Sequence, residues 1–161
     1  MKKLALLLLS SFLLCSCLLI GCGSPDGSDA KTVDMTLEEI YTKMLESVEM
    51  PTMVRVDADY IFNYYGIDVS AFEEYVFAAA EDALLAENII MMKLPEGQSS
   101  ESTVASLEKI IKQKKAELES YLPEQFKIVE KSEVVAKDNY VILIISSKKA
   151  ELEAQLPETL K

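Results

Sequence analysis

The stretch KDNYVILII, residues 137–145, joins a turn signal directly to a continuous apolar run. Asp138 and Asn139 are residue types that favour the tight turn of a β-hairpin. Residues 140–145 are apolar and mostly β-branched, which is typical of a central strand. With the preceding segment FKIVEKSEVVA (126–136), the stretch predicts two antiparallel strands. Of the alternating side chains in 140–145, we expect one set to face helices and the other to be half exposed.

A second apolar run, NIIMMKL at 88–94, also predicts a strand, which Pro95 ends. The alanine-rich segment before it is ambiguous. Ser70 and Glu73 have the spacing of a helix cap, and alanine and leucine favour helices. Residues 73–80 can also be aligned with the alternation of a strand. Periodicity alone leaves both interpretations open for this segment.

An eleven-residue cassette occurs twice, thirty-four residues apart, as KKAELESYLPE (114–124) and KKAELEAQLPE (148–158). Each copy closes a predicted helix, 103–122 and 148–156, the second capped by Ser147, and each helix follows an apolar strand. A tetratricopeptide array has this spacing, but a β-hairpin lies between the copies. The pattern predicts an α+β fold: a four-stranded, mainly antiparallel sheet with helices on one face, built as a ββα–ββα duplication. A chance repeat of helix-forming residues remains the alternative.

One or two helices precede this sheet. Thr36 and Glu39 have capping-box spacing ahead of an amphipathic segment that Pro51 ends. A short helix at 59–65 follows, with Asp57 or Asp59 as its cap and Gly66 at its end. Its tyrosines and isoleucine are expected to form a packing face.

The N-terminal segment MKKLALLLLSSFLLCSCLLIG (1–21) has the charged and apolar regions of a secretory signal. Its apolar run approaches the length of a transmembrane anchor, but it stops at Leu19-Ile20-Gly21-Cys22, which resembles the lipobox of bacterial lipoproteins. That resemblance implies that Cys22 becomes a diacylglyceryl-modified N-terminus and anchors the chain at the extracytoplasmic face of the cell membrane. A weaker lipobox ends at Cys17. Residues 22–35 are then the acylated cysteine and a flexible tether, and 36–161 a single domain.

Composition excludes several kinds of chemistry. The chain has no histidine, and its cysteines (Cys15, Cys17 and Cys22) all lie in the signal region. Ser-His-Asp catalysis, thiol catalysis and histidine-bound zinc are therefore excluded. Without Lys2 and Lys3, 14 basic residues face 27 acidic ones, a net charge of −13, which disfavours nucleic acid as a partner. No cofactor is implied.

Three further segments resemble one family of proteins. Residues 53–68, with the acidic pair Asp57 and Asp59 and the run YYGID (64–68), resemble a family of small uncharacterised lipoproteins of Gram-positive anaerobic bacteria, described as a domain of unknown function. The turn YLPE (121–124) and the hairpin half at 137–145 also match, and the resemblance covers most of residues 36–156. After Tyr75 the chain departs from the family pattern by its alanine content. The resemblance favours a strand at 73–80 and implies a fold and a location, but no activity.

The candidate binding residues lie in the connection before the sheet: Asp57, Asp59, Tyr64, Tyr65 and Asp68. Loops on a rigid scaffold often carry binding, and tyrosine combines an apolar face with a hydroxyl. The competing interpretation is that these tyrosines only fill the core.

Asp57 and Asp59 also have the alternation of calcium ligands. An EF-hand loop starting at Asp57 would place Phe62 where glycine is needed and Asp68 where glutamate is needed. No metal site is predicted.

The sequence therefore predicts a membrane-tethered, non-catalytic module that binds a ligand or another envelope protein. A carboxylate-dependent envelope hydrolase and a spacer lipoprotein without a specific ligand are the alternatives. A concave acidic pocket would favour the hydrolase, and an exposed apolar patch on a bare sheet face would favour the binding module.

Overall fold

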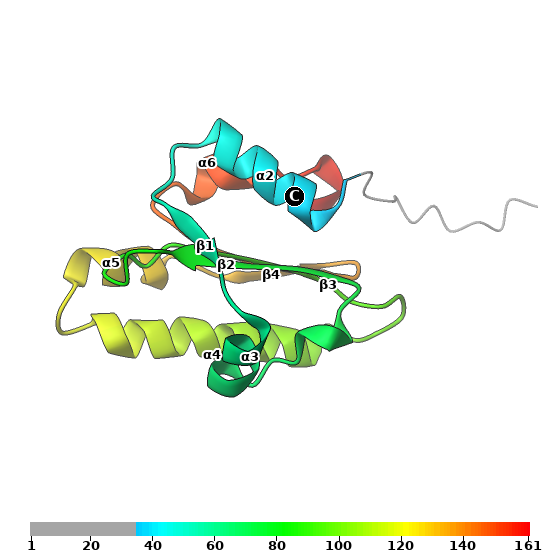
Figure 1. Ribbon diagram of the computed structural model, residues 1–161, viewed down its shortest axis with the longest axis horizontal. Coiled ribbons are helices and arrows are strands. Elements are labelled where there is room, and N and C mark those ends of the chain that lie inside the picture. The colour runs from blue at the N-terminus through cyan, green and yellow to red at the C-terminus, as the bar shows by residue number, and fades with distance from the viewer. Residues whose placement is uncertain (1–34) are drawn as a thin grey trace, which may run out of the picture. The chain divides into compact units, whose positions relative to one another are not determined.

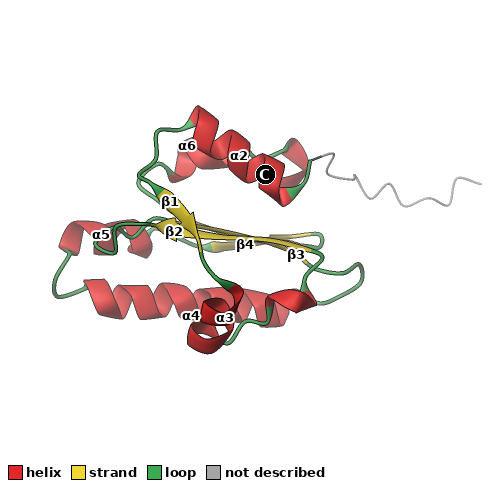
Figure 2. Ribbon diagram, in the orientation of Figure 1, coloured by secondary structure: helices red, strands yellow, loops and turns green. Residues whose placement is uncertain are grey.

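The computed structural model describes residues 35–161, and a five-stranded antiparallel sheet lies at their centre (Figures 1 and 2). The strand order is β1-β2-β3-β5-β4, and every neighbouring pair is antiparallel. The strands are β1 (Met53–Arg55), β2 (Glu74–Ala80), β3 (Asn88–Lys93), β4 (Val134–Lys137) and β5 (Tyr140–Ile145). The predicted signal peptide (1–21), Cys22 and residues 23–34 of the predicted tether lie outside the described residues.

The α+β class is confirmed, but the predicted count of four strands is wrong. The additional strand, β1, pairs with β2 at one edge of the sheet, where Val54 lies opposite Ala79. Three residues are too few to show the alternation that identifies a half-buried strand. Residues 53–55 therefore carry no pattern that identifies β1 as a separate strand.

The alanine-rich segment forms a strand, β2, as the resemblance predicts. Its alternating side chains face opposite sides of the sheet: Phe77 lies in one core cluster, and Val76 and Ala78 lie in the other. The small side chain of Ala78 is fully buried, because the helix α2 (Leu37–Ser47) packs against β2.

Helices cover both faces of the sheet, so the predicted arrangement on one face is wrong. Figure 1 shows α2 and α6 (Lys149–Glu153) on one side. On the other side lie α3 (Ala58–Tyr60) and α4 (Glu101–Leu118), while α5 (Pro123–Glu130) is drawn level with the end of the sheet, packs on α4 and adds Val129 to the core on that side. We call these the α2–α6 face and the α4–α5 face.

All six residues of β5 are buried, which contradicts the expectation that one alternating set is half exposed. Val141, Leu143 and Ile145 belong to the core under the α4–α5 face, whereas Ile142 and Ile144 belong to the core under the α2–α6 face. A strand covered on both sides is apolar at every position, as residues 140–145 are. A run that is apolar at every position is therefore the pattern of a strand with helices on both of its faces.

The two cassettes do not lie in equivalent places. The first ends α4, which has 18 residues, and the second ends α6, which has five. These helices pack on opposite faces, whereas a two-fold axis relating the adjacent antiparallel strands β3 and β5 would keep both helices on one face. The structure therefore does not confirm the duplication.

What the cassettes share is local: a helix ends, a turn follows, and a proline comes at the start of the next helix. Pro123 is the first residue of α5, and Pro157 precedes the 3₁₀ turn η3 (Glu158–Leu160). Proline fits the first turn of a helix because its missing N–H would have no partner there. α5 also takes up residues 126–130, which were predicted to be strand.

The predicted cap of the last helix is wrong, because the N-cap of α6 is Lys148 and no side chain caps this helix. The hydroxyl of Ser146, not Ser147, accepts a hydrogen bond from the N–H of Lys148 (3.0 Å). Ser146 is the buried residue directly after β5, so its side chain is held in place, while Ser147 is exposed.

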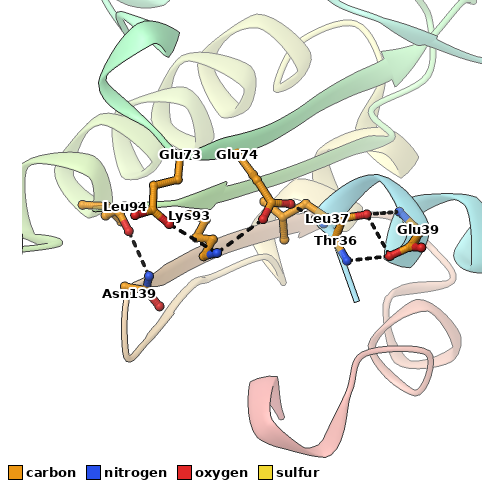
Figure 3. Close-up of polar contacts among 8 residues, drawn as sticks. All are labelled: Thr36, Leu37, Glu39, Glu73, Glu74, Lys93, Leu94 and Asn139. Atoms are coloured by element: carbon orange, nitrogen blue, oxygen red, sulfur yellow. Dashed lines mark hydrogen bonds and ion pairs between the residues drawn. The ribbon is translucent and has the colours of Figure 1, made fainter. Parts of the chain in front are cut away.

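The start of α2 confirms the predicted capping box and ties this helix to the sheet (Figure 3). Glu39 Oε2 accepts the N–H of Thr36 (2.7 Å), and Thr36 Oγ1 accepts the N–H of Glu39 (3.2 Å). These hydrogen bonds lower the pKa of Glu39. From β2, Glu74 Oε2 accepts the N–H of Leu37 (2.9 Å), and the other Glu74 oxygen lies 3.4 Å from Lys93 Nζ. A carboxylate at a helix N-terminus is favourable because the free N–H groups point toward it.

The predicted turn between β4 and β5 is also confirmed. Asp138 adopts a left-handed conformation with φ of 52°, which aspartate and asparagine tolerate better than most residues. Asn139 Nδ2 donates to the carbonyl of Leu94 (2.9 Å), so the turn is fixed to the end of β3 (Figure 3).

Candidate functional site

The predicted binding residues lie on a short helical segment between β1 and β2. Asp57 caps α3, because its Oδ1 accepts the N–H groups of Asp59 (2.9 Å) and Tyr60 (3.4 Å). The segment continues as a π-helical turn, η1 (Ile61–Tyr65), and ends at Gly66 with φ of 70°. The predicted cap and the predicted glycine stop are both confirmed.

The π-helical turn changes which side chains face the core. Ile61 is fully buried and Tyr65 is partly buried, but Tyr60, Phe62 and Tyr64 are 51%, 57% and 47% exposed. We call these three residues the exposed aromatic patch. The prediction of one packing face was wrong for Tyr60 and Tyr64, because the wider i→i+5 turn does not follow the α-helical period.

The three tyrosine rings of this segment are held against one another. Tyr60 and Tyr64 stack with ring centroids 5.2 Å apart, and Tyr65 meets Tyr64 edge-on at 4.9 Å. Tyr65 also stacks on Phe77 of β2 at 5.3 Å. Such pairs add about 0.5–1.5 kcal/mol each beyond the burial of area. A continuous line of rings therefore connects the surface patch to the core and restricts the rotamers of the exposed tyrosines.

The electrostatic surroundings keep the tyrosines neutral. Tyr64 Oη donates a hydrogen bond to Glu117 Oε1 of α4 (3.0 Å), which raises the pKa of Tyr64. Burial is the main cause that raises the pKa of Tyr65 to about 12. Neither phenol can act as a base near neutral pH, and the patch presents uncharged rings.

The remaining predicted site residues have mixed roles. Asp68 Oδ1 accepts the N–H (2.9 Å) and the Oγ–H (2.7 Å) of Ser70, and so caps the 3₁₀ turn η2 (Val69–Ala71). These hydrogen bonds lower the pKa of Asp68. Asp57 and Asp68 thus cap helical turns, whereas Asp59 is exposed and Tyr64 belongs to the exposed aromatic patch. Tyr65 is the support beneath it.

The sequence-based prediction missed Tyr60 and Phe62 as surface residues and Glu117 as the hydrogen-bond partner of Tyr64. One signal was available: Tyr60, Phe62, Tyr64 and Tyr65 fall within six consecutive positions, and positions two apart point to opposite sides of an α-helix. One buried stripe therefore cannot hold all four rings. Glu117 had no signal, because only the tertiary fold brings α4 to this turn.

Two kinds of site are absent from the described part of the chain. Residues 35–161 contain no group of three or more acidic, histidine or cysteine side chains placed to hold a metal ion. None of the helices in this range is long and apolar enough to cross a bilayer.

Taken together, these features define an antiparallel α+β domain with helices on both faces of its sheet and a cluster of exposed aromatic rings on the turn before β2. The chain belongs to the family described as Domain of unknown function (DUF4358), whose model matches residues 46–146. No curated protein and no solved structure matches the chain. The matched range includes the whole sheet and the exposed aromatic patch, while α6 and η3 lie beyond it.

Proposed function

We propose that this protein is a membrane-tethered lipoprotein at the extracytoplasmic face of the cell, as in Gram-positive anaerobic bacteria, and that its domain is a non-catalytic binding module. Support for the tether comes from the sequence, where a signal-like apolar segment ends in the lipobox-like motif at Cys22. Two acyl chains on that cysteine would supply the two membrane signals that stable anchoring needs.

The observation that carries the binding proposal is the exposed aromatic patch. Tyr60, Phe62 and Tyr64 are three large exposed side chains on one turn. The other exposed large apolar side chains of the described residues come from five separate segments: Leu45, Val54, Leu84, Tyr121 and Val135. Clustered aromatic side chains with restricted rotamers dominate the energetics of many protein interfaces.

The charges around the patch favour a partner with basic residues. Glu117 of α4 accepts the hydroxyl of Tyr64, Asp57 and Asp59 directly precede Tyr60 at the start of α3, and the chain as a whole carries a net charge of −11. An arginine or lysine side chain could lie over a tyrosine face and contact a neighbouring carboxylate, an arrangement that contributes about 0.5–2 kcal/mol per contact. We therefore propose an envelope protein with an exposed basic segment as the partner.

The two alternatives have less support. A binding module was expected to expose an apolar patch on a bare sheet face. Helices lie on both faces of the sheet instead, and the exposed aromatic patch lies on the turn before β2. For a hydrolase, the acidic residues that line cavities already pair with lysines: Glu133 and Glu153 with Lys149 (3.1 and 3.5 Å), and Glu124 with Lys127 (2.7 Å). A spacer without a ligand would have no need for exposed aromatic rings that pack on one another.

Replacing the patch by polar side chains should abolish partner binding without unfolding the domain. The triple variant Tyr60→Gln, Phe62→Gln, Tyr64→Gln keeps Tyr65 and Phe77, so we expect its melting temperature to change by less than about 4 °C. In native electrophoresis of membranes solubilised in mild detergent, the wild-type protein should migrate in a complex and the variant alone. The wild-type complex should also dissociate with rising salt, since exposed charge pairs are screened.

Tyr121→Gln is the matched control, because Tyr121 is 85% exposed but lies after α4, outside the patch. This control should migrate as the wild type does. A triple variant that folds and still migrates in the wild-type complex would show that the patch is not the docking surface.

A further inference from the structure

The helices on the α2–α6 face leave part of the sheet uncovered. α6 has five residues and is about 7.5 Å long, whereas the six-residue strand β5 beneath it spans about 20 Å. α2 packs on β2 and β3 instead. As a result Val135 of the edge strand β4 is 37% exposed, and the segment from α6 to η3 encloses a space above β4 and β5.

This space is an open cavity of about 370 Å³, which we call the aliphatic cavity. Its apolar lining is Val135, Ile142, Ile144, Ala154, Leu156 and Leu160. The volume lies within the range of about 300–1,000 Å³ that small-molecule sites occupy. All six of these side chains are aliphatic, so the lining offers no ring on which a planar ligand could stack. A flexible hydrocarbon chain is the ligand shape that such a lining suits.

A second cleft, of about 520 Å³, adjoins the aliphatic cavity, and we call it the lysine cleft. Glu153 lines both spaces, and Lys149 of the cleft ion-pairs with Glu153 and with Glu133 at the cavity rim. The two spaces therefore meet at the Lys149–Glu153 pair.

The lysine cleft has the opposite charge balance to the rest of the chain. Its lining includes Lys127, Lys131 and Lys149 but only two acidic residues, Glu124 and Glu153, in a chain of net charge −11. Glu124 pairs with Lys127 (2.7 Å), while Lys131 has no carboxylate partner within residues 35–161. Ser146 and Ser147 also line the cleft, and because the Ser146 hydroxyl donates to Met50 Sδ (3.8 Å), Ser147 is the one that offers its hydroxyl. Ammonium and hydroxyl donors together favour an anionic group.

We propose that the aliphatic cavity and the lysine cleft form one binding site for an anionic amphiphile with a single hydrocarbon chain. The chain lies against Val135, Ile144 and Leu160, and the anionic head group lies in the cleft beside Lys131. This site is separate from the exposed aromatic patch and does not depend on it. Because α6 and η3 lie beyond residues 46–146, one wall of the site is outside the range that the family model matches.

The test uses calorimetry with defined single-chain probes below their micelle concentrations. The protein is the chain from residue 22 onward with Cys22→Ser, so that no acyl group competes; both cores lie within residues 35–161 and are retained. Dodecanoate should bind at least about tenfold more tightly than dodecyltrimethylammonium, a difference of about 1.4 kcal/mol. Dodecyl phosphate serves as a third probe, and its rank against dodecanoate shows which head group the cleft prefers.

Two substitutions separate the two halves of the site. Val135→Phe should fill the cavity mouth and weaken dodecanoate at least about tenfold, and Ala154→Phe provides a second way to fill it if Val135→Phe does not fold. Lys131→Gln should reduce the preference for dodecanoate over dodecyltrimethylammonium. Val54→Phe is the matched control on the opposite edge strand, where Val54 is 40% exposed.

Equal binding of the anionic and cationic probes would overturn the proposal, because the cleft would then not select charge. Dodecanoate binding that neither Val135→Phe nor Ala154→Phe weakens would also overturn the proposal, because the hydrocarbon chain would then lie outside the aliphatic cavity.

Discussion

Leu143→Ala and Ile144→Ala should each lower the free energy of unfolding by about 2–5 kcal/mol. Leu143 is fully buried under the α4–α5 face, and Ile144 is 2% exposed under the α2–α6 face. Truncating either side chain removes buried methyl groups and leaves a cavity that the surrounding residues fill only partly. Because domains of this size have stabilities of about 5–15 kcal/mol, each change removes a large share of the total.

The measurement is urea unfolding followed by circular dichroism, with Lys109→Ala as the control. Lys109 is exposed on α4, so its removal should change the stability by less than about 0.5 kcal/mol. A large loss for one of the two β5 variants and a negligible loss for the other would mean that helices cover only one face of the sheet, contrary to the structure.

Cys22→Ala should abolish acylation of the protein completely, whereas Cys17→Ala should leave it unchanged. In lipoproteins with such a motif, the diacylglyceryl group is added to the cysteine that ends the motif, and cleavage of the signal depends on that modification. Our proposal places this cysteine at Cys22. The apolar segment 4–21 would remain on an unprocessed chain and could itself hold the protein in the membrane. Finding the Cys22 variant in the membrane fraction would therefore not show that it is acylated.

Labelling with a radioactive fatty acid, together with the size of the mature chain, gives the direct measurement. The Cys22 variant should carry no label and keep the size of the precursor. Normal labelling of this variant together with loss of label in the Cys17 variant would place the anchor at the earlier motif.

The sequence was most informative where a local rule decides the outcome. The capping box of Thr36 and Glu39, the cap at Asp57, the stop at Gly66 and the turn at Asp138 each depend on a few adjacent residues, and the structure confirms all four. Strand β5 was also recognisable, because no other element of six residues is so uniformly β-branched and apolar.

The errors concern features that depend on tertiary packing. A run that is apolar at every position has no preferred face, so residues 140–145 could have shown that both faces are covered, but not which helix lies on which face. The repeated cassette indicated a duplication, yet it specifies only the end of a helix and the proline at the start of the next one. Where α4 and α6 pack depends on the loops before them.

The candidate site shows the same difference between features that adjacent residues decide and features that depend on tertiary packing. Tyr64 and Asp59 were predicted as binding residues and are exposed, while Asp57 and Asp68 hold helix starts and Tyr65 packs on Phe77. Tyr60 was expected to be buried because an α-helical period was assumed where the chain forms a π-helical turn. The aliphatic cavity could not be predicted at all, since its walls come from β4, β5 and the segment after α6.

Photo-crosslinking from the aromatic patch tests the binding proposal most directly. The photoreactive amino acid p-benzoylphenylalanine replaces Phe62 in one strain and Tyr121 in another, and whole cells are irradiated before the proteins are separated by size. Both positions are well exposed, so reagent access alone does not distinguish them. If the exposed aromatic patch binds the partner, position 62 should give a discrete crosslinked product and position 121 none. No product from position 62, or the same product from both positions, would contradict the claim that this patch is where the protein binds its partner.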